Sequence, residues 1–110
     1  DIDSLKYLTL GDPQLINRLI HELSHSSEED LSALRALGPK PSREALRALA
    51  HRIKGGAKML KARGVVRHCE ALEQASLGEA STDQLQALLG ALEQSLLALQ
   101  TQLAHYTVAS

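Results

Sequence analysis

The sequence contains almost no aromatic residues, with two Tyr, no Phe and no Trp among 110 residues. Its β-branched residues are also sparse and never alternate with polar ones over the length of a strand, which argues against a β-sheet. Leucine, in contrast, supplies 22 residues. Ala, Glu, Gln, Lys and Arg, all good helix formers, are also common. This composition predicts an all-α protein.

Three further scarcities limit the classes of function. The single cysteine, Cys69, excludes an intrachain disulfide and a cysteine-rich zinc site, and it fits a reducing compartment. The formal net charge of -1 gives no bulk attraction to nucleic acid or to an anionic membrane. No run approaches the roughly 20 apolar residues that span a bilayer, and the start DIDSLKYLTL does not fit a signal peptide. We therefore expect a cytoplasmic protein without direct membrane contact.

Start and stop signals divide the first half of the chain into helices. A short first helix is expected over about residues 2–8, before Gly11. Asp12-Pro13 is a strong start signal, because Asp can cap a helix and Pro suits its first position. Gly38-Pro39 ends this second helix. Its apolar stripe lapses at Ser26-Ser27, where we expect a bend or a polar patch.

The second half contains three more helices. Ser42 is the expected cap of a helix over residues 43–60, and another helix is expected over residues 64–76. Ser81 and Gln84 can form a capping box at the start of the last helix. The last helix has the clearest 3.6-residue stripe in the chain, formed by Leu85, Leu88, Leu89, Leu92, Leu96, Leu99 and Leu103.

No linker, low-complexity run or internal repeat divides the chain, so residues 1–110 are expected to form one domain. Four amphipathic helices joined by short loops favour an antiparallel bundle. The predicted fold is therefore all-α: an antiparallel four-helix bundle with a short additional N-terminal helix. Because the chain starts at Asp1 and stops at Ser110, we expect a fragment excised from a longer protein.

The helix over residues 43–60 carries the most informative pattern. On a helical wheel of about 100° per residue, His51 lies opposite the apolar face and therefore points to solvent. Arg47, Lys54 and Lys58 fall within about 60° of it on that wheel. The apolar face itself comprises Leu46, Leu49, Ile53, Ala57 and Leu60.

An exposed imidazole among cations suits a phosphorylated histidine. Neutral imidazole is a nucleophile near neutral pH, and neighbouring cations would compensate the charge of an incoming phosphoryl group. Phosphoryl transfer needs mainly positioning and charge stabilisation. The alternative interpretation is an ordinary solvated face, on which His, Lys and Arg are common.

Gly55-Gly56 in the middle of the same helix is a second indication. Each glycine costs about 1 kcal/mol of helix stability relative to Ala. Gly55 lies one turn beyond His51 on the same face, where a missing side chain would let a partner approach the imidazole. Gly56 is turned toward the flank of the core, where we expect it to allow close helix packing.

The segment HRIKGGAKML, followed by CEALE, closely resembles the pattern of histidine-containing phosphotransfer domains. In that family a His is followed by two variable residues, Lys, Gly and a small residue on a bundle helix. A Cys and a Leu-Glu pair commonly follow on the next helix, as Cys69, Leu72 and Glu73 do here. Composition and loops look most like the C-terminal module of a hybrid sensor histidine kinase of the virulence-sensor type.

The resemblance implies specific roles. His51 would accept a phosphoryl group from an aspartate of a receiver domain and pass it to an aspartate of a response regulator. Lys54 would assist the phosphate and Gly55 would admit the receiver, with Arg47 and Lys58 in the phosphate environment. Docking of the receiver is expected to involve Leu8, Leu10, Leu15, Arg52 and Gly56.

The resemblance also implies partners and cofactors. The receivers of a hybrid kinase and of a response regulator would be the partners, with no nucleic acid involved. The receiver would supply Mg²⁺. The domain itself is expected to hold no metal or cofactor and to act as a monomer, and because it has no glycine-rich phosphate loop it should bind no ATP. A parent kinase would tether it at the inner membrane. One departure concerns the family's Gly about ten residues after the His: here that position is Lys61, so the turn is expected to differ.

Two other functions stay open. A non-catalytic helical interaction module would use the same bundle with an unmodified His51. His21-Glu22-Leu23-Ser24-His25 matches the H-E-x-x-H pattern of zinc hydrolases, but no third ligand is apparent. His68 and His105 are expected to be surface residues. Cys69 continues an apolar stripe and is expected to be a buried, inert thiol.

Overall fold

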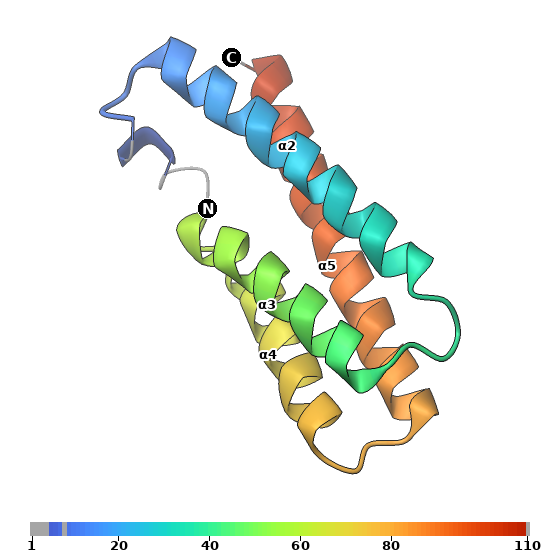
Figure 1. Ribbon diagram of the computed structural model, residues 1–110. Helices are drawn as coiled ribbons and strands as arrows, with labels where there is room; N and C mark the ends of the chain where they lie inside the picture. Colours follow the sequence, from blue (N-terminus) through green and yellow to red (C-terminus); the bar gives the residue numbers. More distant parts are fainter. Residues whose placement is uncertain (1–4, 8, 110) are drawn as a thin grey trace.

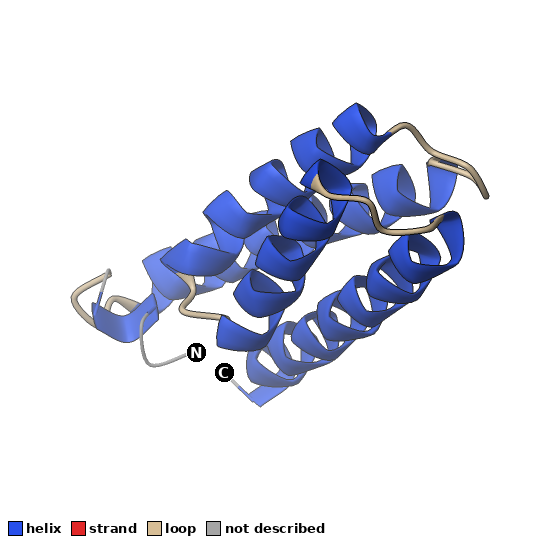
Figure 2. Ribbon diagram, turned by 90° about the horizontal axis from the view of Figure 1, so that it is seen from below, coloured by secondary structure: helices blue, strands red, loops and turns tan. Residues whose placement is uncertain are grey.

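A computed structural model describes the backbone of residues 5–7 and 9–109 and the side chains as far as residue 106. Four long helices form a bundle: α2 (Pro13–Ala36), α3 (Arg43–Met59), α4 (Arg63–Leu77) and α5 (Thr82–Ala109). Residues 5–7 add a short helical segment. Within the described ranges the chain contains helices and loops but no strand (Figure 2). The all-α bundle predicted from the sequence is confirmed.

The helices begin where the capping signals predicted. The Asp12 carboxylate accepts hydrogen bonds from the backbone N–H groups of Gln14 (2.9 Å) and Leu15 (3.4 Å). The Ser42 hydroxyl accepts one from the N–H of Ala45 at 3.0 Å. These bonds satisfy donors that have no partner within the first turn of a helix. They fix the starts of α2 and α3.

The capping box before α5 is also present. The Gln84 N–H donates to the Ser81 hydroxyl at 3.1 Å, and the Ser81 N–H donates to the Gln84 side-chain oxygen at 2.8 Å. Arg43, at the start of α3, reaches the loop between α4 and α5. Its guanidinium donates to the carbonyl oxygens of Ala75 (3.3 Å) and Gly78 (3.1 Å) and also to that of Ala80. The start of α3 is thereby tied to the loop between α4 and α5.

Two apolar clusters fill the interior. The larger one joins all four long helices, and Leu46, Ala50, Cys69, Leu72 and Leu92 are completely buried in it. The smaller one lies at the end of the bundle that carries the N-terminal segment; it comprises Leu5, Ile16, Ile20, Leu60 and Leu103. The second cluster attaches the N-terminal segment to the end of α3 (Figure 1). No helix of the described residues has the length and apolar character needed to cross a membrane.

The possible bend at Ser26-Ser27 does not form, because α2 is a single helix from Pro13 to Ala36. Ser26 is exposed, whereas Ser27 is buried. The Ser27 hydroxyl makes no hydrogen bond within the described part of the chain. The polar residues that interrupted the stripe therefore leave a buried hydroxyl rather than a kink.

The turn after α3 keeps the left-handed geometry of a glycine cap although Lys61 occupies the position. Lys61 has φ of +54°. Its N–H donates to the Lys58 carbonyl at 3.1 Å, and the Ala62 N–H donates to the Ala57 carbonyl at 2.9 Å. These two bonds define a Schellman motif. The prediction that the turn would differ is therefore wrong for its geometry; what differs is a side chain in a conformation that favours glycine.

Candidate functional site

His51 lies in the middle of α3 and points away from the core, with its side chain 79% exposed. The residues on the opposite face of α3, Leu46, Leu49, Ile53, Ala57 and Leu60, are all buried. The helical wheel thus predicted the orientation of this imidazole correctly, because burial of the apolar stripe leaves the opposite face in solvent.

A carboxylate from the neighbouring helix lies close to the imidazole. Glu73, on the adjacent helix α4, places Oε2 at 4.0 Å from Nδ1 of His51. Its other oxygen, Oε1, lies 2.7 Å from Nζ of Lys54. One carboxylate therefore lies beside both His51 and Lys54, and the Nδ1 side of the ring faces α4.

Sequence reasoning noticed Glu73 only as part of a family pattern and gave it no role. The available signal was its position one turn after the buried Cys69, on a helix expected to pack against α3. Wheel arguments treat each helix alone, so they do not show which residue of α4 reaches the His51 face. The contact depends on how α3 and α4 pack against each other.

The sequence suggested that Lys54 extends freely beside His51, but the structure shows that it does not. Its side chain is only 17% exposed and is held by Glu73. The hydrogen bond from the Lys54 ammonium to Glu73 raises the pKa of this lysine, and burial opposes the shift. Lys54 therefore stays protonated, and the Glu73 carboxylate already compensates its charge.

Arg47 is a second cation that is not free beside His51, contrary to the prediction from the sequence. The Arg47 guanidinium donates a hydrogen bond to the Ser76 carbonyl oxygen at 3.2 Å, which directs it toward the end of α4. Lys58 is exposed and lines a cleft with Lys61, Arg63 and Arg67. The predicted roles of Arg47 and Lys58 in the phosphate environment remain predictions.

Both glycines of α3 leave open space. A Cβ atom placed on Gly55 would meet no atom within 4 Å, and the same holds for Gly56. For Gly55 this agrees with a bare patch one turn from His51. For Gly56 the expectation of close helix packing is wrong, because the position is exposed and nothing presses against it.

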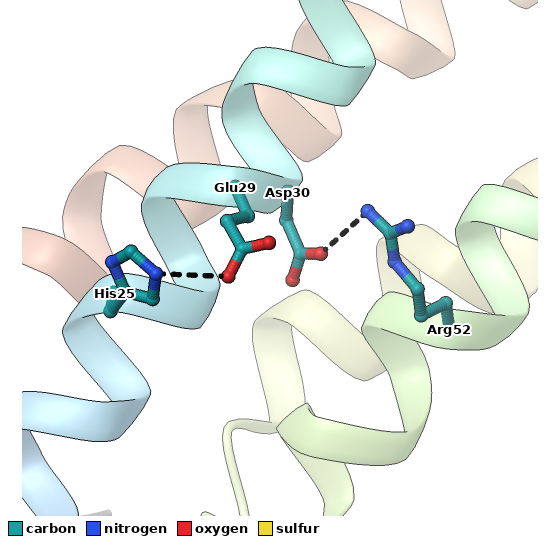
Figure 3. Close-up of polar contacts among 4 residues, drawn as sticks. All are labelled: His25, Glu29, Asp30 and Arg52. Atoms are coloured by element: carbon teal, nitrogen blue, oxygen red, sulfur yellow. Dashed lines mark hydrogen bonds and ion pairs between the residues drawn. The ribbon is translucent and has the colours of Figure 1, made fainter.

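The residues expected to dock a receiver are exposed where they are described. The Leu10 side chain is 95% exposed and that of Leu15 is 44% exposed, whereas Leu8 lies outside the described residues. Arg52 donates to the Asp30 carboxylate on α2 at 3.0 Å (Figure 3). Burial raises the pKa of Asp30, and the Arg52 guanidinium opposes that shift. The ion pair holds Arg52 across the α2–α3 seam.

The other histidines do not assemble a second site. His25 pairs with Glu29 at 3.2 Å on the surface of α2 (Figure 3), and His21 is exposed. Among the described residues, no group of three or more His, Cys, Asp or Glu is placed to hold a metal ion. His68 was expected at the surface but is half-buried, with Nδ1 2.5 Å from the Ser95 hydroxyl. His105 is exposed, as expected.

Cys69 is completely buried between α3 and α4, which confirms the sequence prediction. Burial raises the pKa of its thiol to about 12, with Glu73 contributing further. The thiol is therefore protonated at neutral pH and unsuited to nucleophilic chemistry. His51, in contrast, presents an exposed imidazole.

The site thus combines an exposed histidine on a bundle helix, a lysine and a carboxylate beside it, and a bare backbone patch one turn away. This combination agrees with a protein family that matches the chain. The model of the Hpt domain matches residues 12–103. The chain belongs to the Hpt domain family. The Hpt domain thus has a phosphotransfer role in two-component signalling.

Relatives of this Hpt domain carry the name virulence sensor protein BvgS. Those of Bordetella bronchiseptica, Bordetella parapertussis and Bordetella pertussis are each 29% identical to it over 102 residues. The matched region is 92% of this chain but 8% of each relative, so the Hpt domain spans a small part of their length. No solved structure matches significantly.

Proposed function

We propose that this Hpt domain is an intermediate of a phosphorelay, in which His51 accepts a phosphoryl group from a receiver aspartate. The observation that carries the proposal is the outward imidazole, which is 79% exposed and whose Nδ1 lies 4.0 Å from the Glu73 carboxylate. The second nitrogen, Nε2, is then the atom open to a partner. The bare patch at Gly55 leaves room for that partner.

The proposed transfer balances without any further reactant. The lone pair of Nε2 attacks the phosphorus of the aspartyl phosphate, the P–O bond to the aspartate breaks, and the carboxylate leaves with the electron pair. Nδ1 keeps its proton, so the phosphorylated ring carries a positive charge that the Glu73 carboxylate stabilises. Attack by a carboxylate of a response regulator reverses these steps and returns neutral His51.

The Lys54 ammonium has a different part. It cannot accept a proton at neutral pH, because Glu73 holds it charged. It instead compensates phosphoryl oxygens on His51 and fixes the Glu73 carboxylate. Mg²⁺ and the remaining charge stabilisation are supplied by the receiver, whose own site makes and breaks the aspartyl phosphate.

The relatives suggest the wider setting. Because they are named virulence sensors and the match covers 8% of their length, we propose that this domain works as one module of a hybrid sensor kinase. Its cytoplasmic receivers would belong to that kinase and to a response regulator. Small, transient interfaces are typical of such encounters.

The test is transfer from a phosphorylated receiver to the purified chain, followed by mapping of the modified residue. The label should be acid-labile and base-stable and should map to His51, and His51→Gln should fold normally without taking label. Labelling of the variant at the wild-type level would contradict the proposal. Binding of the receiver without label would favour the non-catalytic interaction module.

A further inference from the structure

Four cations converge at the end of the bundle that lies beyond His51. Lys58 from the last turn of α3, Lys61 from the turn, and Arg63 and Arg67 from the start of α4 line one open cleft of about 650 Å³, with Val66 beside them. All four cationic side chains are exposed. This group is referred to below as the basic cleft.

The charges of the basic cleft are not compensated within the part of the chain that the structure describes. None of its four side chains forms an ion pair there, and Glu70, the nearest acidic residue along α4, forms none with them. Five other cations of the bundle are engaged with carboxylates or carbonyl oxygens: Arg35, Arg43, Arg47, Arg52 and Lys54. The chain as a whole has a formal charge of -1, so the uncompensated positive charge is local.

The position of the basic cleft connects it to the reactive face. Lys58 follows His51 by seven residues, which is two helical turns or about 10 Å along α3. Gly55 lies between them with its open backbone. The N-terminal segment with the exposed Leu10 lies at the same end of the bundle (Figure 1). A protein domain that covers His51 and Gly55 can therefore reach the basic cleft.

We propose that the basic cleft binds an acidic surface of the receiver domain that docks at His51, and that it selects receivers carrying such a surface. This inference rests on the proposed function. Uncompensated cations within a Debye length of about 8 Å of a docked partner accelerate encounter and disfavour partners of like charge. The cleft acts before the chemical step, because its cations lie at the end of the bundle beyond the imidazole rather than around it.

The experiment compares two doubly neutralised variants of the full chain. Lys61→Gln with Arg67→Gln removes two charges from the basic cleft, whereas Arg35→Gln with Lys40→Gln removes two at the opposite end of the bundle. Transfer from a phosphorylated receiver is measured between about 20 and 500 mM NaCl, a range over which screening of exposed charges changes strongly. Circular dichroism checks that both variants are folded.

We expect the cleft variant to lose about tenfold in kcat/KM at low salt, with kcat within twofold, and to lose most of its salt dependence. The control variant should transfer like wild type at every salt concentration. Equal losses in both variants, or a cleft variant with wild-type kcat/KM, would overturn the inference while leaving the proposed function intact. Loss of binding to phosphatidylglycerol vesicles with unchanged transfer would assign the cleft to lipid instead. Failure of the wild type to take label would refute the proposed function itself.

Discussion

The Glu73 carboxylate lies 4.0 Å from Nδ1 of His51 with one oxygen and 2.7 Å from Nζ of Lys54 with the other. It comes from α4, whereas both partners come from α3. The position of the reactive ring is therefore linked to the packing of two helices. A change in Glu73 should affect the chemistry of His51 more than the stability of the bundle.

Glu73→Gln should slow phosphoryl transfer to His51 by about tenfold, which corresponds to roughly 1.4 kcal/mol. Glutamine keeps the size of the side chain but removes the charge that stabilises the phosphorylated ring. The free energy of unfolding should change by less than about 1 kcal/mol, since the glutamine side-chain oxygen can still accept a hydrogen bond from the Lys54 ammonium. Quenched time courses of phosphoryl transfer measure the rate, and urea unfolding measures the stability. Glu70→Gln, an exposed change on the same helix, should leave both unchanged; a wild-type rate for Glu73→Gln would exclude the carboxylate from the mechanism.

Gly55 is predicted to be kept for access rather than for folding. Because a Cβ meets no atom there, Gly55→Ala should stabilise the protein by about 1 kcal/mol. Gly55→Leu should fold equally well but slow transfer from a receiver at least tenfold, because the side chain stands one turn from His51. Gly90 on α5 is the matched control, since a Cβ meets no atom there either. Gly90→Leu should leave transfer unchanged, and an unimpaired Gly55→Leu would remove the access argument.

Lys61 offers a test of backbone strain. Its φ of +54° is a conformation that favours glycine, so Lys61→Gly should raise the free energy of unfolding by about 0.5–1 kcal/mol. Lys61→Ala keeps the Cβ and should give no such gain. Urea denaturation of the three proteins measures the difference. Equal stabilisation by Ala and Gly would show that the charge of Lys61, and not its backbone, causes the effect.

The Arg52–Asp30 pair should give a pH-dependent contribution to stability. Above the raised pKa of Asp30 the carboxylate is charged and partly buried, and Arg52 compensates it. Arg52→Met should therefore cost about 0.5–1 kcal/mol at pH 7, a modest value because Arg52 is largely exposed. The pKa of Asp30 lies above the ordinary aspartate value of 3.8. As the pH falls through this raised pKa, the carboxyl becomes neutral and the cost of Arg52→Met should disappear.

The control for this prediction is Asp30→Asn, which removes the charge at every pH. In that background Arg52→Met should have little effect on the unfolding free energy. Thermal or urea unfolding between pH 3 and pH 7 supplies the data. A cost of Arg52→Met that is the same at both ends of this range would show that packing of the arginine stem, not the ion pair, stabilises the seam.

The fold was predictable because its signals are local. Asp12-Pro13, Ser42 and the pair of Ser81 and Gln84 mark helix starts through bonds to residues two or three positions away. The outward orientation of His51 followed in the same way from the apolar stripe of its own helix. Such features depend on one element and its period, which the sequence displays directly.

Contacts between helices were not predictable in this way. The partners of Lys54 and Arg47 lie on α4, and each holds a cation that the wheel had placed around His51. The partner of Arg52 lies on α2. The buried hydroxyl of Ser27 and the hydrogen bond between His68 and Ser95 likewise depend on the neighbouring helix. Rotation and register between helices decide these contacts, and no single-helix pattern contains them.

The most direct measurement locates the phosphoryl group on the ring. After transfer from a phosphorylated receiver to the chain labelled with ¹⁵N-histidine, coupling between ³¹P and ¹⁵N identifies the bonded nitrogen. The account predicts that the coupled nitrogen is Nε2 of His51, with Nδ1 still protonated and facing Glu73. A phosphoryl group on Nδ1 of His51, on another histidine, or on none would contradict it.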